Sequence, residues 1–512
     1  MRGKNYKIWI ALAALTAPAV ASTASLSDSL RIQRRHHEAA ILQEFIDLLS
    51  IPNVGSDKPN IRRNAEFIAA MMQRRGINAV LLDGDSSDAN PAVFGEVKTL
   101  GARKTITFYA HYDGQPVNPA KWAEGLKPFA PVLITAPIER GGSVLGSYQS
   151  GREVSDDWRI AARSAADDKA GVMTILNAFS ALIESRRRLH INVKFFFEGE
   201  EELGSPHLDE ILAKHSDLLT TDAWVIADGP RLALGRKSIE FGVRGDVNLT
   251  LTVFGPKRPL HSGNYGNWAP NPALRLASLL VSMKDAQDHV TISGYYDDVV
   301  PLSPRERAAL EQVPSIEAAL QAELGIATPD GNGSSMAELL TRPSLNINGI
   351  QSGDVGFSAN NIIPSHADAV LDLRLAKGNT VNGQVKKVID HIKAQGFHVI
   401  DRDPTDEERR TYDKLIRVSV RPGYEAQRTS MDSPIAREVV AAVQSTSQDP
   451  VVTVVSVGGS LPLILFERRF GANVLTVPVV NYDNNQHAEN ENVQVGFLWE
   501  GIEEMAAIMS IQ

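Results

Sequence analysis

The sequence contains no cysteine among its 512 residues. This absence excludes disulfide bonds, iron–sulfur clusters, zinc sites built from thiolates and a cysteine nucleophile. Any metal ion must therefore be held by histidine, aspartate and glutamate, which suit zinc, manganese or cobalt. Lysine and arginine number 52 against 61 aspartates and glutamates, so the formal net charge is −9. An acidic chain is poorly suited to general nucleic-acid binding, because the phosphate backbone repels it.

Long hydrophobic runs are also scarce. Past residue 21 no segment has the roughly 18 uncharged apolar residues of a membrane-spanning helix. Residues 1–21 have the features of a secretory signal: three basic side chains in the first seven residues, an apolar stretch at 8–17, and a small-x-small cleavage site at Ala19-Val20-Ala21. A membrane anchor is the alternative, but the run is short and Pro18 interrupts it. We expect a cleaved signal and a soluble, exported protein, periplasmic or secreted, with no membrane association.

The order of predicted elements indicates an α/β fold with a second domain inserted into it. Apolar spacing predicts helices and strands that alternate along the chain, at 36–50, 60–75, 79–82, 92–97, 105–110, 168–184, 191–197 and 223–227. From about 242 the pattern changes to half-exposed strands such as 246–253, followed by helices and strands in β-α-β order. We therefore expect a mixed, largely parallel sheet formed by 22–241 and 423–512, and an inserted two-layer α+β, ferredoxin-like domain over 242–422.

Five short segments place histidine or carboxylates at predicted strand ends or in the loops that follow. They are centred on His111, Asp167, Glu201-Glu202, Asp228 and His487. Sites in open α/β sheets form at the carboxyl ends of strands. Each segment alone is weak evidence, because surface loops and helix N-termini often carry such residues. Together they supply what a two-metal site requires: a carboxylate bridging two ions about 3.5–4 Å apart, and another carboxylate as general base.

These motifs resemble the M20 family of metallopeptidases, most closely its carnosinase-like dipeptidase branch. The resemblance extends over nearly the whole chain after the signal. Its most specific strings are His111-Tyr112-Asp113-Gly114-Gln115-Pro116-Val117 and Glu198-Gly199-Glu200-Glu201-Glu202-Leu203-Gly204-Ser205. The segment 48–54 and the string Ala165-Ala166-Asp167-Asp168-Lys169 also match.

The resemblance implies two divalent metal ions per chain, with Zn²⁺ expected and Mn²⁺ or Co²⁺ as alternatives. Asp167 would bridge both ions. His111 and Asp228 would complete one metal, and Glu202 and His487 would complete the other.

The resemblance also implies the remaining roles in the main, catalytic domain. Glu201 would be the general base, taking a proton from a water held between the metals, and Asp113 would orient His111. The peptide bond between residues 167 and 168 would be cis. Two departures stand out: Ala162-Arg163-Ser164 replaces the usual Gly-Arg-Gly, and Asp168 stands where this branch often has Asn.

The inserted domain would be the family's lid and would form a homodimer. His261 resembles the lid histidine that reaches the partner subunit's active site and stabilises the oxyanion. Asn361 and Arg374 resemble the region that binds the substrate carboxylate, which suits a guanidinium. Gly459 and Ser460 resemble a turn that contacts the substrate backbone.

We therefore expect an exported di-metal hydrolase that cleaves the amide bond of dipeptides or short peptides. The main alternative is an N-acyl-amino-acid amidohydrolase or deacetylase with the same site. A non-enzymatic binding protein is a third possibility, which the presence of every ligand and of the base disfavours.

Overall fold

The computed structural model describes residues 26–149, 153–232 and 235–512. The signal predicted at 1–21 lies outside these residues. Within them, every helix is either too short or too polar to cross a membrane.

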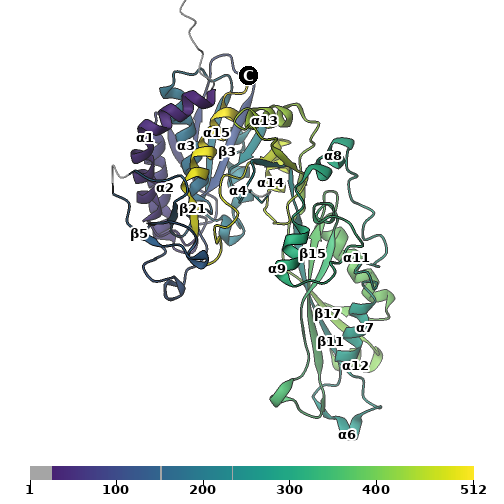
Figure 1. The fold of residues 1–512 in the computed structure, drawn as a ribbon. Coiled ribbons are helices and arrows are strands. Elements are labelled where there is room, and N and C mark those ends of the chain that lie inside the picture. Colours follow the sequence, from purple (N-terminus) through teal and green to yellow (C-terminus); the bar gives the residue numbers. More distant parts are fainter. Residues whose placement is uncertain (1–25, 150–152, 233–234) are drawn as a thin grey trace, which may run out of the picture.

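The main body is built on an eight-stranded mixed sheet (Figure 1). Its strands, in spatial order, are β1 (Ala79–Leu82), β2 (Ala92–Val97), β7 (Asn192–Glu198), β3 (Thr105–His111), β8 (Ala223–Ile226), β20 (Asn473–Thr476), β9 (Ser238–Glu240) and β19 (Val452–Val454). The four central strands β7, β3, β8 and β20 are parallel, and β1 and β2 extend the sheet in antiparallel fashion. The predicted mixed sheet with a parallel centre is confirmed.

Helices cover both faces of this sheet. One face packs against α1 (Leu26–Leu49), α2 (Lys58–Arg74), α3 (Lys169–Glu184), α13 (Pro434–Gln444) and α15 (Val495–Met509). The other packs against α4 (Leu208–Lys214) and α14 (Ile464–Phe470). Alternation along β3 explains this division, because Phe108 and Ala110 join the first cluster whereas Tyr109 joins the second. A smaller four-stranded sheet consists of β21 (Asn492–Gln494), β6 (Arg159–Ala161), β4 (Val132–Ile134) and β5 (Val144–Gly146).

The inserted region forms a second, five-stranded sheet with helices on one face. In spatial order the strands are β13 (Ser344–Gln351), β15 (His366–Leu375), β11 (Gly245–Phe254), β17 (Leu415–Val420) and β16 (His398–Ile400). The apolar residues of α7 (Pro272–Val281) and α11 (Val381–Ala394) pack on alternate residues of β11 and β15. This is the predicted two-layer α+β structure, and Figure 1 shows it projecting away from the main body.

Short elements lie where the chain enters and leaves this region and at its far end. β10 (Gly242–Val243) pairs with β18 (Gln427–Arg428), so the two crossings lie side by side. At the far end, β12 (Leu260–His261) pairs with β14 (Ile362–Ile363) beside α6 (Ser262–Tyr265) (Figure 1). Further helices are α5 (Ser216–Leu219), α8 (Pro304–Gln312), α9 (Glu317–Leu324), α10 (Met336–Leu339) and α12 (Asp406–Thr411). The exact domain limits at 241/242 and 422/423 stay predictions.

Candidate metal centre

Segments far apart in the sequence converge at the carboxyl ends of the central parallel strands. His111 is the last residue of β3, and Asp228 lies two residues past β8. The Glu201–Leu203 turn follows β7, and Asp167 lies just before α3. His487 comes from the loop after β20. The parallel pairing of β7, β3 and β8 places three of these segments at the same sheet edge, as expected for an α/β site.

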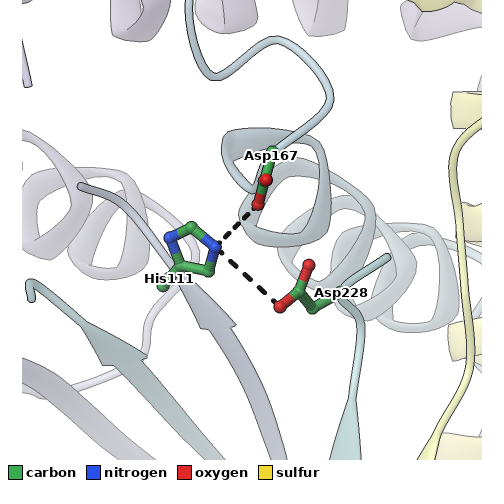
Figure 2. A group of neighbouring side chains, drawn as sticks. All are labelled: His111, Asp167 and Asp228. Atoms are coloured by element: carbon green, nitrogen blue, oxygen red, sulfur yellow. Dashed lines mark hydrogen bonds and ion pairs between the residues drawn. The ribbon is translucent and has the colours of Figure 1, made fainter. Parts of the chain in front are cut away.

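The first group of ligand atoms is buried. Nε2 of His111 lies 2.9 Å from Oδ1 of Asp167 and 3.9 Å from Oδ2 of Asp228 (Figure 2). One donor atom from each residue lies within 4.8 Å of the other two. A nitrogen and two carboxylate oxygens converging at this spacing can hold one divalent cation.

The second group shares Asp167 with the first. Nε2 of His487 lies 3.0 Å from Oδ2 of Asp167 and 3.4 Å from Oε2 of Glu202. Asp167, Glu202 and His487 again place donor atoms within 4.8 Å of one another. Asp167 thus presents one oxygen to each histidine, which is the arrangement that a bridging carboxylate requires. These two groups bring together the five residues that the sequence indicated as ligands.

Electrostatics at this edge favour a bound cation. Burial and the charge of Asp167 raise the pKa of Asp228 to about 6 and that of Glu202 to about 7. The hydrogen bond to Asp167 raises the pKa of His487 to about 9. Carboxylates crowded in a buried site repel one another, and divalent cations relieve that repulsion. The donor set therefore fits the hard or borderline ions expected from a chain without cysteine.

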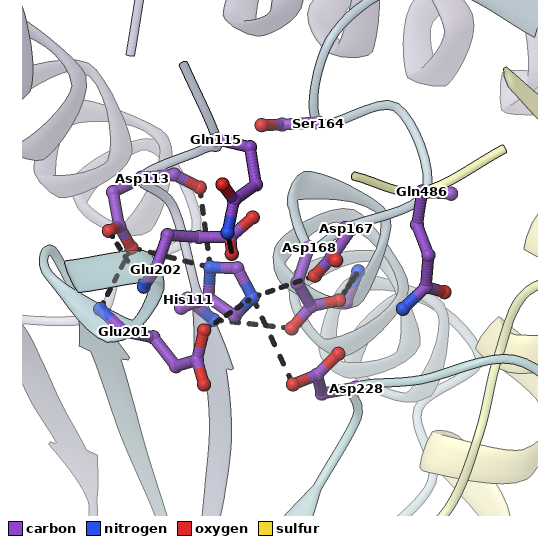
Figure 3. A network of polar contacts seen from close by, with 12 residues as sticks. His111, Asp113, Gln115, Ser164, Asp167, Asp168, Glu201, Glu202, Asp228 and Gln486 are labelled. Carbon is purple, nitrogen blue, oxygen red and sulfur yellow. Dashed lines mark hydrogen bonds and ion pairs between the residues drawn. The ribbon is translucent and has the colours of Figure 1, made fainter. Parts of the chain in front are cut away.

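Asp113 connects two of the converging loops. Its buried carboxylate lies 3.3 Å from Nδ1 of His111, the ring nitrogen opposite the metal group. The same carboxylate accepts the backbone N–H groups of Glu201 at 3.1 Å and Glu202 at 3.0 Å (Figure 3). Asp113 therefore contacts both the His111 ring and the turn that carries the two glutamates, a position from which a carboxylate can orient a ligand histidine.

Glu201 lies beside the two groups and belongs to neither of them. Its Oε2 is 3.8 Å from Nε2 of His111, and its side chain is 14% exposed. Burial, followed by the neighbouring carboxylates Asp228 and Glu202, raises the pKa of Glu201 well above its usual value. A carboxylate with a raised pKa at the edge of a metal site is suited to accept a proton.

Two supporting residues were missed by the sequence reasoning. Glu491 is buried, and its carboxylate accepts backbone N–H groups of the loop that leads to Asp167. Gln115 donates from Nε2 to Oε2 of Glu202 at 2.6 Å. Their nearness in sequence to predicted ligands could have identified them. Glu491 follows His487 by four residues, and Gln115 lies in the string that begins at His111.

The two departures from the family pattern have visible structural roles. Ser164 has a φ of 61°, a conformation that glycine adopts most easily, which accounts for the glycine usual at this place. Its hydroxyl accepts a hydrogen bond from Asn53 at 2.9 Å. Asp168 caps α3 by accepting the N–H of Gly171, and it also accepts the N–H of His111. The peptide bond between Asp167 and Asp168 is cis, as predicted.

The other predicted site residues lie outside the two groups. His261 and Asn361 are exposed neighbours at the far end of the inserted region, where Ser262 donates its N–H to the Asn361 carbonyl. Figure 1 places this end, marked by α6, far from the main sheet. Within one chain they are therefore not brought to the metal groups.

Arg374, Gly459 and Ser460 gather at the base of the inserted region. Nη1 of Arg374 donates to Oγ of Ser460 at 2.8 Å, and Nε donates to Asp372 at 3.0 Å. The carbonyl of Gly459 accepts the N–H of Arg244 at 3.2 Å. The structure thus joins the predicted carboxylate-binding arginine to the predicted substrate-contacting turn.

Known proteins share this sequence pattern. The sequence model described as Peptidase family M20/M25/M40 matches residues 107–510. The Beta-Ala-His dipeptidase of Homo sapiens is 25% identical over 437 residues, which cover 83% of this chain and 78% of that protein. The Cys-Gly metallodipeptidase DUG1 of Candida albicans is 26% identical over 467 residues, which cover 87% of this chain and 89% of that protein.

Solved structures show the same fold. The M20 family metallo-carboxypeptidase Sso-CP2 from Sulfolobus solfataricus has a TM-score of 0.72 at 25% identity, covering 92% of this chain and 98% of that chain. Human carnosine dipeptidase 1 has a TM-score of 0.69 at 23% identity, covering 95% of this chain and 98% of that chain. At this identity the likeness supports a shared fold and nothing further. The family match over most of the chain shows that the protein belongs to peptidase family M20/M25/M40, and is a metallopeptidase that hydrolyses peptide bonds.

Proposed function

We propose that this protein is a dipeptidase that works with two divalent metal ions, of which Zn²⁺ is the first candidate. The observation that carries the proposal is the position of Asp167, whose two oxygens lie 2.9 Å from His111 and 3.0 Å from His487. His111, Asp167 and Asp228 would hold one ion, and Asp167, Glu202 and His487 the other. Two of the relatives described above are named as dipeptidases, which supports the substrate class.

When bound, the two ions would lower the pKa of the attacking water and polarise the scissile carbonyl. Glu201 would accept the proton of that water and deliver it to the leaving amine, because its carboxylate lies 3.8 Å from Nε2 of His111 and belongs to neither ligand group. Asp113 would hold the His111 ring and the turn that carries Glu201 in fixed positions relative to each other through its three contacts.

Substrate binding would involve the base of the inserted region. Arg374 offers a guanidinium that is about one-third exposed, and Ser460 already accepts one of its N–H groups. A guanidinium can bind a free carboxylate through two hydrogen bonds, which suits the C-terminus of a dipeptide.

We further propose that the protein is an exported homodimer in which His261 acts in the active site of the partner subunit. His261 is exposed at the far end of the inserted region and makes no contact with its own metal groups. A group that donates to the developing oxyanion must lie beside the metals, so a second chain would have to bring it there. Export rests on the signal-like residues 1–21, and N-terminal sequencing of the secreted fraction tests for cleavage after Ala21.

The proposed activity is tested by amino-acid release from paired amides. The protein is stripped with chelator, reloaded with Zn²⁺, Mn²⁺ or Co²⁺, and given unblocked dipeptides alongside matching N-acetyl amino acids. We expect metal-dependent cleavage of the unblocked dipeptides. Cleavage of the acetylated series alone would assign the protein to the amidohydrolases, and activity that survives chelation would contradict a metal centre.

A further inference from the structure

The acidic string after β7 contains two glutamates that the proposed mechanism does not use. Glu198 is the last residue of β7, and its Oε2 accepts the hydroxyl of Tyr109 at 2.8 Å. Glu200 lies directly before the turn that carries Glu201 and Glu202, and only 1% of its surface is exposed. A buried carboxylate costs free energy unless new hydrogen bonds replace those of water, so the partners of Glu200 indicate its role.

Glu200 accepts hydrogen bonds from two segments that flank the turn. Its Oε1 accepts the backbone N–H of His207 at 2.9 Å, and ring Nδ1 of His207 donates to the same oxygen at 3.0 Å. Its Oε2 accepts the backbone N–H of Asn90 at 3.2 Å. His207 lies directly before α4, and Asn90 lies in the loop between β1 and β2. The carboxylate therefore connects the start of α4 to that loop, through hydrogen bonds of the charge-assisted kind.

The backbone of Glu200 closes the turn itself. Its carbonyl accepts the N–H groups of Leu203 at 3.1 Å and of Ser205 at 3.0 Å. The buried side-chain amide of Asn90 donates to the preceding carbonyl, that of Gly199, at 2.7 Å. Glu200 thus anchors the turn twice, through its backbone and through its side chain.

Glu201 depends on this anchoring more than Glu202 does. Glu202 accepts a hydrogen bond from Gln115 at 2.6 Å, and it belongs to a group of metal ligands. Among the residues that the structure describes, no hydrogen bond reaches the Glu201 carboxylate, and its one ion pair is with His111 at 3.8 Å. The direction of the Glu201 side chain is therefore set mainly by the backbone of the turn.

We propose that Glu200 and His207 are positioning residues that hold the Glu201 carboxylate at the metal site. This inference rests on the proposed role of Glu201 as general base. A displacement of about 1 Å can cost about 100-fold in rate, even when the substituted residue lies away from the chemistry. Neither Glu200 nor His207 belongs to a ligand group, so their substitution removes no donor atom from the metals.

Two substitutions at His207 isolate its hydrogen bond to Glu200. In His207→Asn the amide nitrogen takes the place of ring Nδ1 and can still donate, whereas His207→Phe keeps a ring and has no donor. We expect His207→Phe to lower kcat on a dipeptide by at least about tenfold, with KM within about twofold and metal content unchanged. His207→Asn should keep most of the activity. An unchanged kcat in His207→Phe, or an equal loss in both variants, would overturn the proposal.

A second comparison shows whether His207 acts through Glu201. In Glu201→Gln protein the base is already lost, so adding His207→Phe should lower kcat no further. A further loss as large as that in the wild-type background would contradict the positioning role, because it would mean that the substitution acts by another route. Should His207→Phe fail to fold, Glu200→Gln carries the same expectation, since an amide accepts through one oxygen only.

The matched control is His215→Phe, at the other end of the same helix. His215 directly follows α4, and its Nε2 donates to the carbonyl of Asp83 at 3.1 Å, in the same loop as Asn90. We expect this substitution to leave kcat, KM and metal content unchanged. A loss equal to that of His207→Phe would show that any disturbance of α4 has this effect, and would overturn the specific role of His207.

Hydrogen exchange separates this proposal from the assignment of the base. Deuterium uptake is followed in peptides that cover residues 198–205 of the zinc-loaded protein, because amide exchange reports local opening. We expect faster uptake in His207→Phe, and wild-type uptake in His207→Asn and His215→Phe. Unchanged uptake in His207→Phe would overturn the anchoring of the turn, whatever the activity. Near-normal turnover of Glu201→Gln, together with faster uptake in His207→Phe, would overturn only the role of Glu201 as base.

Discussion

Glu491 accepts the backbone N–H of Asp167 at 3.0 Å through Oε1. The same oxygen accepts the N–H of Ala166, and Oε2 accepts from Ser164 and from the guanidinium of Arg163. Glu491 is fully buried, so these bonds are shielded from water. One carboxylate from the C-terminal part of the chain therefore fixes the loop from which Asp167 reaches both metal groups.

We predict that Glu491→Gln weakens metal binding by about 10- to 100-fold, the usual effect of losing a partner behind a ligand. An amide can accept through only one oxygen, so at least one of the loop N–H groups loses its acceptor. The measurement is metal affinity by competition with a chromophoric chelator. Glu504→Gln serves as a control for loss of a buried carboxylate elsewhere. Equal metal affinity in Glu491→Gln and wild type would remove Glu491 from this positioning role.

Glu201→Gln should keep both metal ions and lose most of the turnover. The side chain lies outside both ligand groups, so its amide leaves the donor atoms unchanged. Loss of a general base typically lowers kcat by about 10²- to 10⁴-fold. Metal content by elemental analysis and kcat on a dipeptide provide the two readouts. A variant with near-normal kcat would exclude Glu201 as the base.

Metal binding should release protons near neutral pH. Before metal binds, Asp228 and Glu202 have pKa values of about 6 and about 7, and His487 one of about 9. Metal ligands must be ionised carboxylates and neutral imidazole, so uptake displaces the protons that these groups hold. Affinity should therefore rise as pH increases from about 6 to about 9. Calorimetry in buffers of different ionisation enthalpy measures the proton count, and a count of zero at pH 7 would contradict this linkage.

Mixed dimers test the proposed role of His261 across subunits. We expect His261→Ala and Glu201→Gln to be inactive separately. If His261 serves the partner subunit, a mixed dimer has one complete site, and random mixing of equal amounts restores about a quarter of wild-type sites. The control is the mixture assayed before subunit exchange. Activity that never exceeds the sum of the two parents would contradict a homodimer with shared sites.

The parts of the site nearest the strand ends could be predicted from the sequence. His111 and Asp228 follow apolar runs that form β3 and β8, and parallel strands bring their carboxyl ends to one edge. Strand alternation likewise indicated the two-layer inserted region, because β11 buries every second residue along most of its length. Both predictions depended on local sequence patterns, apolar strand runs and strand alternation, and tertiary packing did not override either pattern.

Other features had no comparable local signal. α15 was missed because it is buried on nearly all sides, even at Glu503 and Glu504, so the apolar stripe of a surface helix is weak. α14 was also not predicted, since it is only 7 residues long and follows the Gly458-Gly459-Ser460 turn. Glu200 and Glu491 are carboxylates whose burial depends on distant segments. Their surroundings can be known only once the strands are placed.

The most direct test of the two-metal centre is a crystal structure of the Zn²⁺-loaded protein, with anomalous data collected on both sides of the zinc absorption edge. We expect two anomalous peaks about 3.5–4 Å apart, with one oxygen of Asp167 on each. His111 and Asp228 should bind the first ion, and Glu202 and His487 the second. A single peak, or two peaks without Asp167 between them, would contradict the bridging role on which the proposed mechanism depends.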